Sequence, residues 1–373
     1  MTTPTAQLYV DLDAVAANTQ LFAALTAGEL MAVVKADAFG HGAEAVARTA
    51  LASGASWLGV TSVEEALALR HAGIAAPVVS WLNPVDADFR AAVRRRVDLA
   101  VPGVLHLDAM ARAAADVRRP AYLHLHVDLG MARDGCPPTE WDELCRLAAT
   151  AERHRLVRVV GVMGHLACAD QPGHPSNLGA ARAFRSALDV AAEHGLRPHL
   201  RHVASTAAAL TDPSTHHDLC RVGAGLYGID PSGTTQLQPA LTLTAPVVSV
   251  RDVPAGTPVG YGHTYATERA TRLALLPVGY ADGIPRTSRG FVSLDGHRLP
   301  VVGTVSMDQV VVDAGDAPVQ PGDVAVFFGP GHHGEPTVAE WAAWSGTIAH
   351  EIVTGIGPRV RRTTVAASVR RSA

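Results

Sequence analysis

A single lysine interrupts an apolar segment near the N-terminus. Lys35 lies near the end of the run Met31–Ala36, five residues before the turn that starts at Gly40 (Gly40-His41-Gly42). A buried ammonium is costly unless it is paired, so a lysine in such a place tends to lose its proton. A neutral amine is a nucleophile for carbonyl groups. Lys35 is therefore either a Schiff-base lysine or a lysine whose side chain reaches from a strand end into solvent.

Further polar residues lie in or just after later apolar segments. In chain order they are Asp128, Arg133, His165, His202, Ser205, Arg221, Gly223 and Ala224. Turn amides and a serine hydroxyl can bind phosphate, and a cation can face a ring nitrogen. With Lys35, this set suits a carbonyl cofactor that carries a phosphate.

Eight strand-like segments must position these residues, and helical segments separate most of them. The predicted strands are 31–36, 57–61, 77–81, 98–101, 122–128, 159–166, 199–205 and 219–225. This alternation predicts a (β/α)8 barrel, in which chemistry lies where the strands end. An open doubly wound sheet is the alternative, although no Gly-x-Gly-x-x-Gly joins a strand to a helix.

After Asp230 the sequence changes to short alternating strands separated by turns, which predicts a second, mostly β domain. We place the barrel at residues 1–235 and the β domain at residues 236–373, with a first strand, 8–12, as a candidate member of the β domain. Asp13 is the expected cap of a helix over 14–25. The tail from Arg370 is expected to be loose.

Composition excludes several classes of protein. The net charge is −4, so no basic surface for nucleic acid is expected. No apolar run approaches the ~20 residues that cross a bilayer, and the N-terminus lacks the pattern of a signal peptide. The four cysteines are irregularly spaced, and His124 and His126 are two residues apart without further ligands. We therefore expect a cytoplasmic protein with no membrane, nucleic-acid or metal site.

The motifs resemble those of alanine racemases, a family of fold-type III pyridoxal-phosphate enzymes. The matching segments occur in the family's order, across both predicted domains. They are AVVKADAFGHG (32–42), HVDLGMARDG (126–135), GHLA (164–167), HVASTAA (202–208), RVGAGLYG (221–228), YGHTY (261–265), PVGYADG (277–283) and VSMDQ (305–309).

The resemblance implies a homodimer that binds pyridoxal 5'-phosphate through Lys35. Lys35 would be one of two catalytic bases. Tyr261 would be the other, contributed with Met307 by the partner subunit. His165 would hydrogen-bond that tyrosine, and Arg221 would donate to the pyridine nitrogen.

The resemblance also implies the contacts of the other motif residues. His202 would stack on the cofactor ring, and Ser205, Gly223 and Ala224 would bind its phosphate. The expected substrate-binding residues are Arg133, Met307 and its neighbour Asp308, with Tyr265 and Tyr280 lining the entrance.

The activity implied is interconversion of L- and D-alanine, which supplies D-alanine for a bacterial wall. One alternative is a racemase for serine or another small amino acid. A second is a non-catalytic pyridoxal-phosphate-binding protein, but such proteins resemble the barrel alone. A fold-type III decarboxylase would carry a cysteine in its β domain, and this chain has none after Cys220.

Three positions depart from the family pattern. Phe39 replaces a tyrosine, and no tyrosine follows Tyr280, although both family tyrosines commonly bond the phosphate. His126 replaces a lysine, often carbamylated, that orients the strand-five arginine, here Arg133.

Because each missing neutral hydrogen bond costs roughly 0.5–1.5 kcal/mol, we predict weaker cofactor retention than in a racemase with both tyrosines. Measured cofactor dissociation constants test this prediction, and equal constants would contradict it.

Overall fold

The computed structural model describes residues 6–287 and 289–365, so the tail from Arg370 lies outside the described residues. Contacts divide the chain into two compact units. We call residues 15–38 with 42–237 the barrel unit. Residues 1–14, 39–41 and 238–373 form the β unit.

Eight parallel strands form the barrel unit's sheet, in the order β8-β7-β6-β5-β4-β3-β2-β9. They are β2 (Glu29–Val33), β3 (Trp57–Val60), β4 (Val78–Ser80), β5 (Asp98–Val101), β6 (Ala121–His126), β7 (Val157–Met163), β8 (Leu200–His202) and β9 (Leu219–Val222). The Asp218 and Arg221 amides donate to the Arg201 and Ala204 carbonyls, which joins the ends of this sheet. The predicted (β/α)8 barrel is therefore confirmed, and the open sheet is excluded.

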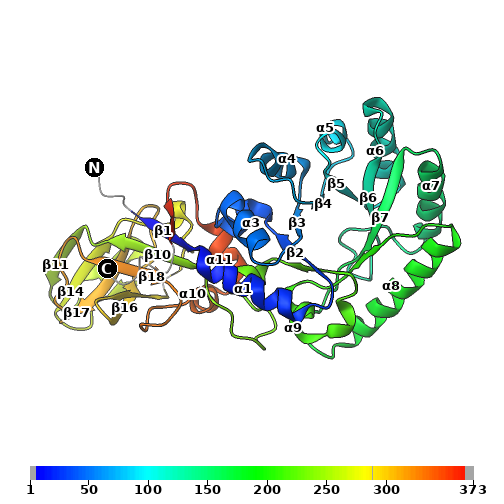
Figure 1. Ribbon diagram of the computed structural model, residues 1–373. Coiled ribbons are helices and arrows are strands. Elements are labelled where there is room, and N and C mark those ends of the chain that lie inside the picture. The colour runs from blue at the N-terminus through cyan, green and yellow to red at the C-terminus, as the bar shows by residue number, and fades with distance from the viewer. Residues whose placement is uncertain (1–5, 288, 366–373) are drawn as a thin grey trace. The chain divides into compact units, whose positions relative to one another are not determined.

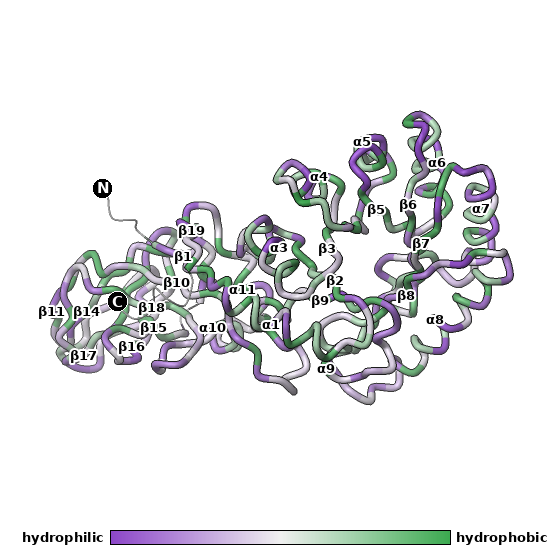
Figure 2. Tube along the Cα trace, in the orientation of Figure 1, coloured by the Kyte–Doolittle hydropathy of each residue, from purple (hydrophilic) through white to green (hydrophobic). Residues whose placement is uncertain are grey.

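Helices lie outside these strands, as Figure 1 shows for α4 to α7. The helices are α1 (Leu12–Leu25), α3 (Ala43–Ala52), α4 (Val63–His71), α5 (Phe89–Arg94), α6 (Val104–Val117), α7 (Trp141–Arg153), α8 (Pro175–Glu193) and α9 (Thr206–Thr211). In α7 the buried residues Trp141, Leu144, Cys145 and Ala148 recur every three or four positions, as in a helix with one apolar face. Hydrophilic and hydrophobic stretches accordingly alternate along α7 and α8 (Figure 2).

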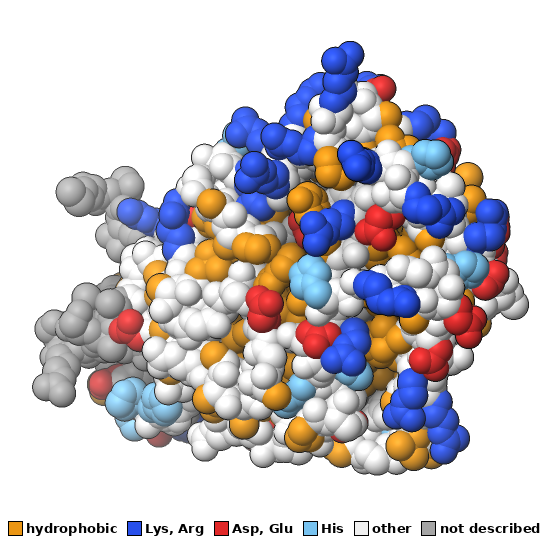
Figure 3. Space-filling view, turned by 45° about the vertical axis from the view of Figure 1, so that its right-hand side comes forward, with side chains coloured by type: hydrophobic (Ala, Val, Ile, Leu, Met, Phe, Trp, Pro, Cys, Tyr) orange, Lys and Arg blue, Asp and Glu red, His pale blue; other side chains and the backbone are white. Residues whose placement is uncertain are grey.

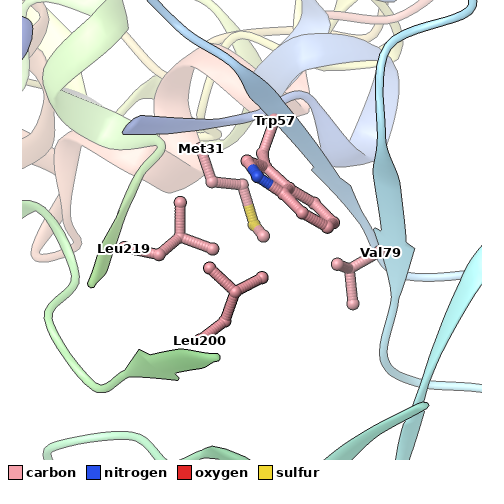
Figure 4. Packing of buried hydrophobic residues seen from close by; sticks show 5 residues of the cluster. All are labelled: Met31, Trp57, Val79, Leu200 and Leu219. Atoms are coloured by element: carbon pink, nitrogen blue, oxygen red, sulfur yellow. The ribbon is translucent and has the colours of Figure 1, made fainter. Parts of the chain in front are cut away.

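Large apolar side chains fill part of the barrel interior. Figure 4 shows side chains from β2, β3, β4, β8 and β9 meeting there. They are Met31, Trp57, Val79, Leu200 and Leu219, and Trp81 packs against them. Gly59 provides the room, because a Cβ at this position would lie 2.6 Å from the Trp81 ring and 2.8 Å from the Met31 sulfur.

A nine-stranded sheet, in the order β11-β14-β17-β16-β15-β18-β10-β1-β19, forms the β unit. Its strands are β1 (Gln7–Asp11), β10 (Leu241–Pro246), β11 (Ser249–Val253), β14 (Thr271–Leu276), β15 (Phe291–Leu294), β16 (His297–Val302), β17 (Val310–Gly315), β18 (Val324–Phe328) and β19 (Arg361–Val365). Two helices, α10 (Val338–Ser345) and α11 (Ala349–Gly355), and the short pair β12 (Pro258–Val259) and β13 (Tyr265–Ala266) complete it.

Several predicted boundaries were wrong. Asp11, not Asp13, caps α1, because its Oδ1 accepts from the amides of Asp13 and Ala14. Lys35, Asp128 and His165 lie just beyond their strands rather than in them, because each strand is shorter than its apolar run.

Gly59→Ala should lower the free energy of unfolding by roughly 1–3 kcal/mol, because Trp81 and Met31 must shift to admit the methyl group. Gly179→Ala is the control, since a Cβ at this exposed position of α8 meets nothing within 4 Å. The control should stabilise by about 0.5–1 kcal/mol. Denaturant unfolding measures both changes, and equal stability of the two variants would contradict this packing.

Candidate active site

A left-handed turn follows β2 and carries the lysine. The segment α2 (Lys35–Gly40) has φ of +51° to +56° at its four non-glycine residues 36–39. Each such residue costs about 1–2 kcal/mol, so neighbouring groups must hold the turn. Glu65 Oε1 accepts from the Ala36 amide at 2.7 Å, while its Oε2 accepts from the Thr61 amide and hydroxyl at 2.8 Å. Asp37 Oδ1 accepts from the Ala43 amide at 2.7 Å.

The Lys35 amine lies among cations and an aromatic ring. Its Nζ is 6.0 Å from the centre of the Trp81 ring. Burial lowers the pKa of Lys35, and the charges of Arg133 and Arg221 lower it further, against the opposing charge of Glu65. Lys35 is also the only lysine of the sequence, so the basic side chains on the face in Figure 3 are otherwise arginines. This environment favours the neutral, nucleophilic amine.

Arg221 is a buried cation without a carboxylate partner among the described residues. Its Nη1 donates to His202 Nδ1 at 3.1 Å and to the His202 carbonyl at 2.7 Å. Its Nη2 donates to the carbonyls of Gly164 at 2.7 Å and Val203 at 3.2 Å. Burial lowers the pKa of Arg221 to about 10. Within the described part of the chain no bond is recorded for its Nε–H, which leaves one donor for an acceptor in the site.

His165 is held neutral beside Arg221. Its Nδ1 lies 3.3 Å from Arg221 Nη2. Because arginine only donates, Nδ1 accepts, and the ring proton is on Nε2. Burial, and then the charges of Arg221, Arg133 and Lys35, lower the pKa of His165 to about 3. His165 can therefore donate one hydrogen bond from Nε2 without carrying charge.

The structure does not support the stacking role expected of His202. Its side chain has 0% exposure, and its Nε2 lies 2.9 Å from His124 Nδ1. With Nδ1 bonded to Arg221, both ring nitrogens are occupied by protein groups. His202 therefore lies behind Arg221 and orients it, because a ring without exposed surface cannot contact a ligand.

A closed loop after β6 carries Arg133. The Cys136 amide donates to the His126 carbonyl, and the Asp128 amide donates to the Cys136 carbonyl, which ties the base of the loop. His126 Nδ1 lies 3.5 Å from Asp134 Oδ2. Burial would raise the pKa of Asp134, but the nearby His126 imidazole and the hydrogen bond from the Gly135 amide lower it. Asp134, which the sequence interpretation missed, thus anchors the loop beside Arg133.

A second turn supplies groups suited to a phosphate. Ser205 precedes α9 without capping it through its side chain. The Thr206 hydroxyl accepts from the amides of Gly223 and Gly225, at 3.3 and 3.2 Å. Gly225 is required here, since a Cβ would lie 2.4 Å from the Phe22 ring. The Ser205 hydroxyl and the cations Arg133 and Arg221 form a donor set that fits a phosphorylated ring compound with an acceptor nitrogen, while the Gly223 and Gly225 amides already donate to Thr206.

The β unit carries the remaining predicted residues on exposed turns. Tyr261, Met307 and Tyr280 are 73%, 53% and 40% exposed. The Tyr280 and Ala281 amides donate to the carbonyls of Ser306 and Met307 at 3.0 and 2.9 Å, so these two turns are joined.

Two other predicted residues of the β unit are engaged by protein groups. Asp308 pairs with Arg359 at 2.8 Å, so its carboxylate has a structural partner. The Tyr265 hydroxyl donates to Asp313 at 3.3 Å. Phe39, also in this unit, is buried, with its ring 6.0 Å from that of His350.

Comparison with known proteins places the sequence in a family. It matches the alanine racemase N-terminal domain over residues 10–231 and the C-terminal domain over residues 240–364. The chain belongs to the alanine racemase family. An alanine racemase of Salinispora tropica is 47% identical, over 94% of this chain and 96% of the relative.

Solved structures of alanine racemases agree with this assignment. That from D-cycloserine-producing Streptomyces lavendulae has a TM-score of 0.95 and 44% identity, over 98% of both chains. That from Bartonella henselae, which has covalently bound pyridoxal phosphate, has a TM-score of 0.88 and 28% identity, over 97% of this chain and 100% of the other.

The described residues contain neither a membrane-crossing helix nor a cluster of metal ligands. No helix in residues 6–287 and 289–365 is long and apolar enough to cross a membrane. The same residues contain no group of three or more His, Cys, Asp or Glu that could hold a metal ion.

Because Lys35 is the only lysine, aldehyde modification of the cofactor-free chain reports its amine once the α-amine is blocked. We predict that the modification rate rises through an apparent pKa below the ordinary lysine value. Arg133→Ala should move this pKa up, because it removes a cation, whereas Glu65→Gln should move it down. Mass spectrometry across pH measures both shifts, and shifts of the same sign would contradict the assigned charges.

Proposed function

We propose that this chain is a pyridoxal-phosphate-dependent racemase that interconverts L- and D-alanine. The observation that carries the proposal is Lys35, the only lysine, with its pKa lowered by burial and by the cations Arg133 and Arg221. The family assignment over both units supports it.

Residues of the barrel unit would hold the cofactor. Lys35 would bond its carbonyl carbon, and the Nε–H of Arg221 would donate to its ring nitrogen. Ser205, Gly223 and Ala224 would bind the phosphate. Bound pyridoxal phosphate supplies an electron sink that makes the α-proton of an amino acid acidic. A permanently protonated arginine at the ring nitrogen donates a hydrogen bond but transfers no proton readily, which would limit side reactions.

Two bases on opposite faces would exchange the α-proton. The Lys35 amine would remove or return it on one face, and the Tyr261 hydroxyl on the other. His165 suits the second base, because its Nε2–H can donate to a tyrosine oxygen while its ring stays neutral. Arg133 and the backbone at Met307 would bind the substrate carboxylate.

We propose that Tyr261 and Met307 complete the site of a partner subunit in a homodimer. Their exposure of 73% and 53% in the single chain supports this, since both side chains are accessible to a partner. Tyr265 would line the entrance. Asp308, paired with Arg359, would act through its backbone and its hold on the turn.

A racemase for serine or another small amino acid is the second candidate. The observation that favours it is the pair His126–Asp134 beside the loop of Arg133, at the position where a lysine is common in the family. A panel of amino acids separates the two candidates.

Lys35→Ala should abolish the visible absorbance of the lysine-bound cofactor and racemisation in both directions. Tyr261→Phe should keep the absorbance and lose racemisation, by about 10²-fold or more, because one general base is missing. Spectra and racemisation assays measure both effects. Absorbance retained in Lys35→Ala would refute the cofactor assignment, and normal racemisation by Tyr261→Phe would refute the two-base assignment.

Mixing the two inactive variants tests the shared site. If Tyr261 serves the partner, a mixed dimer holds one complete site, and re-equilibrated mixtures should recover about a quarter of wild-type activity. Each variant passed alone through the same treatment is the control. Mixed dimers without recovered activity would place Tyr261 in the site of its own chain.

A further inference from the structure

A chain of hydrogen bonds crosses the barrel interior behind Arg221. Arg221 Nη1 lies 3.1 Å from His202 Nδ1, and His202 Nε2 lies 2.9 Å from His124 Nδ1. His124 Nε2 lies 3.4 Å from Asp98 Oδ2. The four residues come from β9, β8, β6 and β5. All four are buried, and both histidines have 0% exposure.

The two ends of this chain fix the direction of every bond in it. An arginine only donates and a carboxylate only accepts, while a neutral imidazole donates from one nitrogen and accepts at the other. Arg221 must therefore donate to His202 Nδ1, His202 Nε2–H to His124 Nδ1, and His124 Nε2–H to Asp98. A second proton on either ring would bring two donors face to face, so all three bonds require both histidines to be neutral.

We propose that Asp98 is the counter-charge of Arg221, connected to it through the neutral imidazoles of His124 and His202. The two histidines and Asp98 are positioning residues, because they act on the reacting groups only through Arg221. Buried charges are retained when they are paired, and within residues 6–287 and 289–365 Arg221 contacts no carboxylate directly. The hydrogen-bond chain also orients His165, because His165 Nδ1 accepts from Nη2 of the same Arg221 guanidinium.

The residues packed around His124 leave room for its ring in this position and exclude water from it. A Cβ at Gly161 would lie 2.3 Å from His124 Nδ1, so only glycine leaves room for the ring. The Trp57 ring meets His124 edge-on at 5.7 Å, and His202 meets it at 5.0 Å. Exclusion of water from both rings strengthens each bond of the chain.

The alternative role for Asp98 is to pair with the neighbouring cation Arg70. Its charge also raises the pKa of Arg70, against the lowering effect of burial. Arg70 already donates to the carbonyls of Ile74, Ala76 and Arg96. Asp98 and Arg70 line a cavity of about 610 Å³ at the end of the barrel where β5 begins. A small anion could therefore replace a deleted Asp98 side chain.

Long-range ¹H–¹⁵N correlation spectra of the histidine-labelled, cofactor-free chain test the inference. Such spectra report which ring nitrogen carries the proton, and His124→Gln and His202→Gln assign the signals. We expect each ring to carry one proton, on Nε2, because the bonds of the hydrogen-bond chain allow no other arrangement. A charged ring, or a proton on Nδ1 of either, would overturn the proposed direction.

Asp98→Ala tests the counter-charge. Loss of the acceptor should shift the Nε2–H signal of His124, and the shifts should continue to His202 and His165 if the bonds are coupled. Asp218→Asn is the control, because Asp218 pairs with Arg201. Neither residue belongs to the hydrogen-bond chain from Arg221 to Asp98. Shifts confined to His124 would overturn the proposal and leave Asp98 as the partner of Arg70.

Formate and formamide added to Asp98→Ala show whether the negative charge of the lost carboxylate matters or only its volume. Formate should restore the three shifted signals, and neutral formamide should not. Equal restoration by both compounds would overturn the proposed charge role.

The activity readout rests on the proposed racemase function. Asp98→Ala should lower kcat for alanine by about 10-fold. This is the lower end of the loss in activity when a residue that orients a functional side chain through a hydrogen bond is removed. KM should change little, because Asp98 touches no substrate-binding residue. A change in KM alone would contradict the positioning role. The spectra require no activity, so failure of the racemase assignment and failure of this inference are distinguishable.

Discussion

The buried guanidinium of Arg221 is the constraint on which the rest of the site depends. It can be solvated only if several acceptors converge on it, and the carbonyls of Gly164, His202 and Val203 do so. These carbonyls lie at the ends of β7 and β8, while Arg221 lies on β9. Closure of the barrel and solvation of the cation are therefore one requirement. A barrel open between β8 and β9 would leave a charge in the core without bonds, at a cost of several kcal/mol.

Burial and the charges of two arginines, of which Arg221 is one, lower the pKa values of its neighbours. Lys35 and His165 both have lowered pKa values, with burial as the first cause and arginine charges as the next. A site that keeps its amine and its imidazole neutral while holding two arginines has an excess of positive charge. Asp98 would offset part of this excess through the two imidazoles, and an entering anion would relieve the remainder. The electrostatics thus favour a ligand with both a phosphate and a carboxylate, which a cofactor with a bound amino acid provides.

The sequence predicts the barrel because buried parallel strands must be continuously apolar, and that pattern needs no tertiary information. The ends of the strands are less predictable. His165 and Asp128 lie in apolar surroundings but beyond the last ladder bond, which depends on the neighbouring strand. His202 illustrates a second limit: a histidine on a strand can face the cavity or the core, and only the position of Arg221 decides. Asp134 is adjacent to Arg133 in the sequence. Its contact with His126 depends on closure of the loop and could not be predicted.

The left-handed turn at residues 36–39 could not be predicted, because left-handed conformations are ordinarily assigned to glycine. Four non-glycine residues in this conformation store several kcal/mol of strain by the cost of about 1–2 kcal/mol for each. Glu65 and Asp37 offset part of it: Glu65 accepts from the Ala36 amide at the start of the turn, and Asp37 accepts from the Ala43 amide that begins the next helix. Such strain persists where the surroundings over-determine a segment, as they do around reacting groups. Here the turn begins at Lys35, so the strained segment fixes the backbone of the one residue whose amine the chemistry requires.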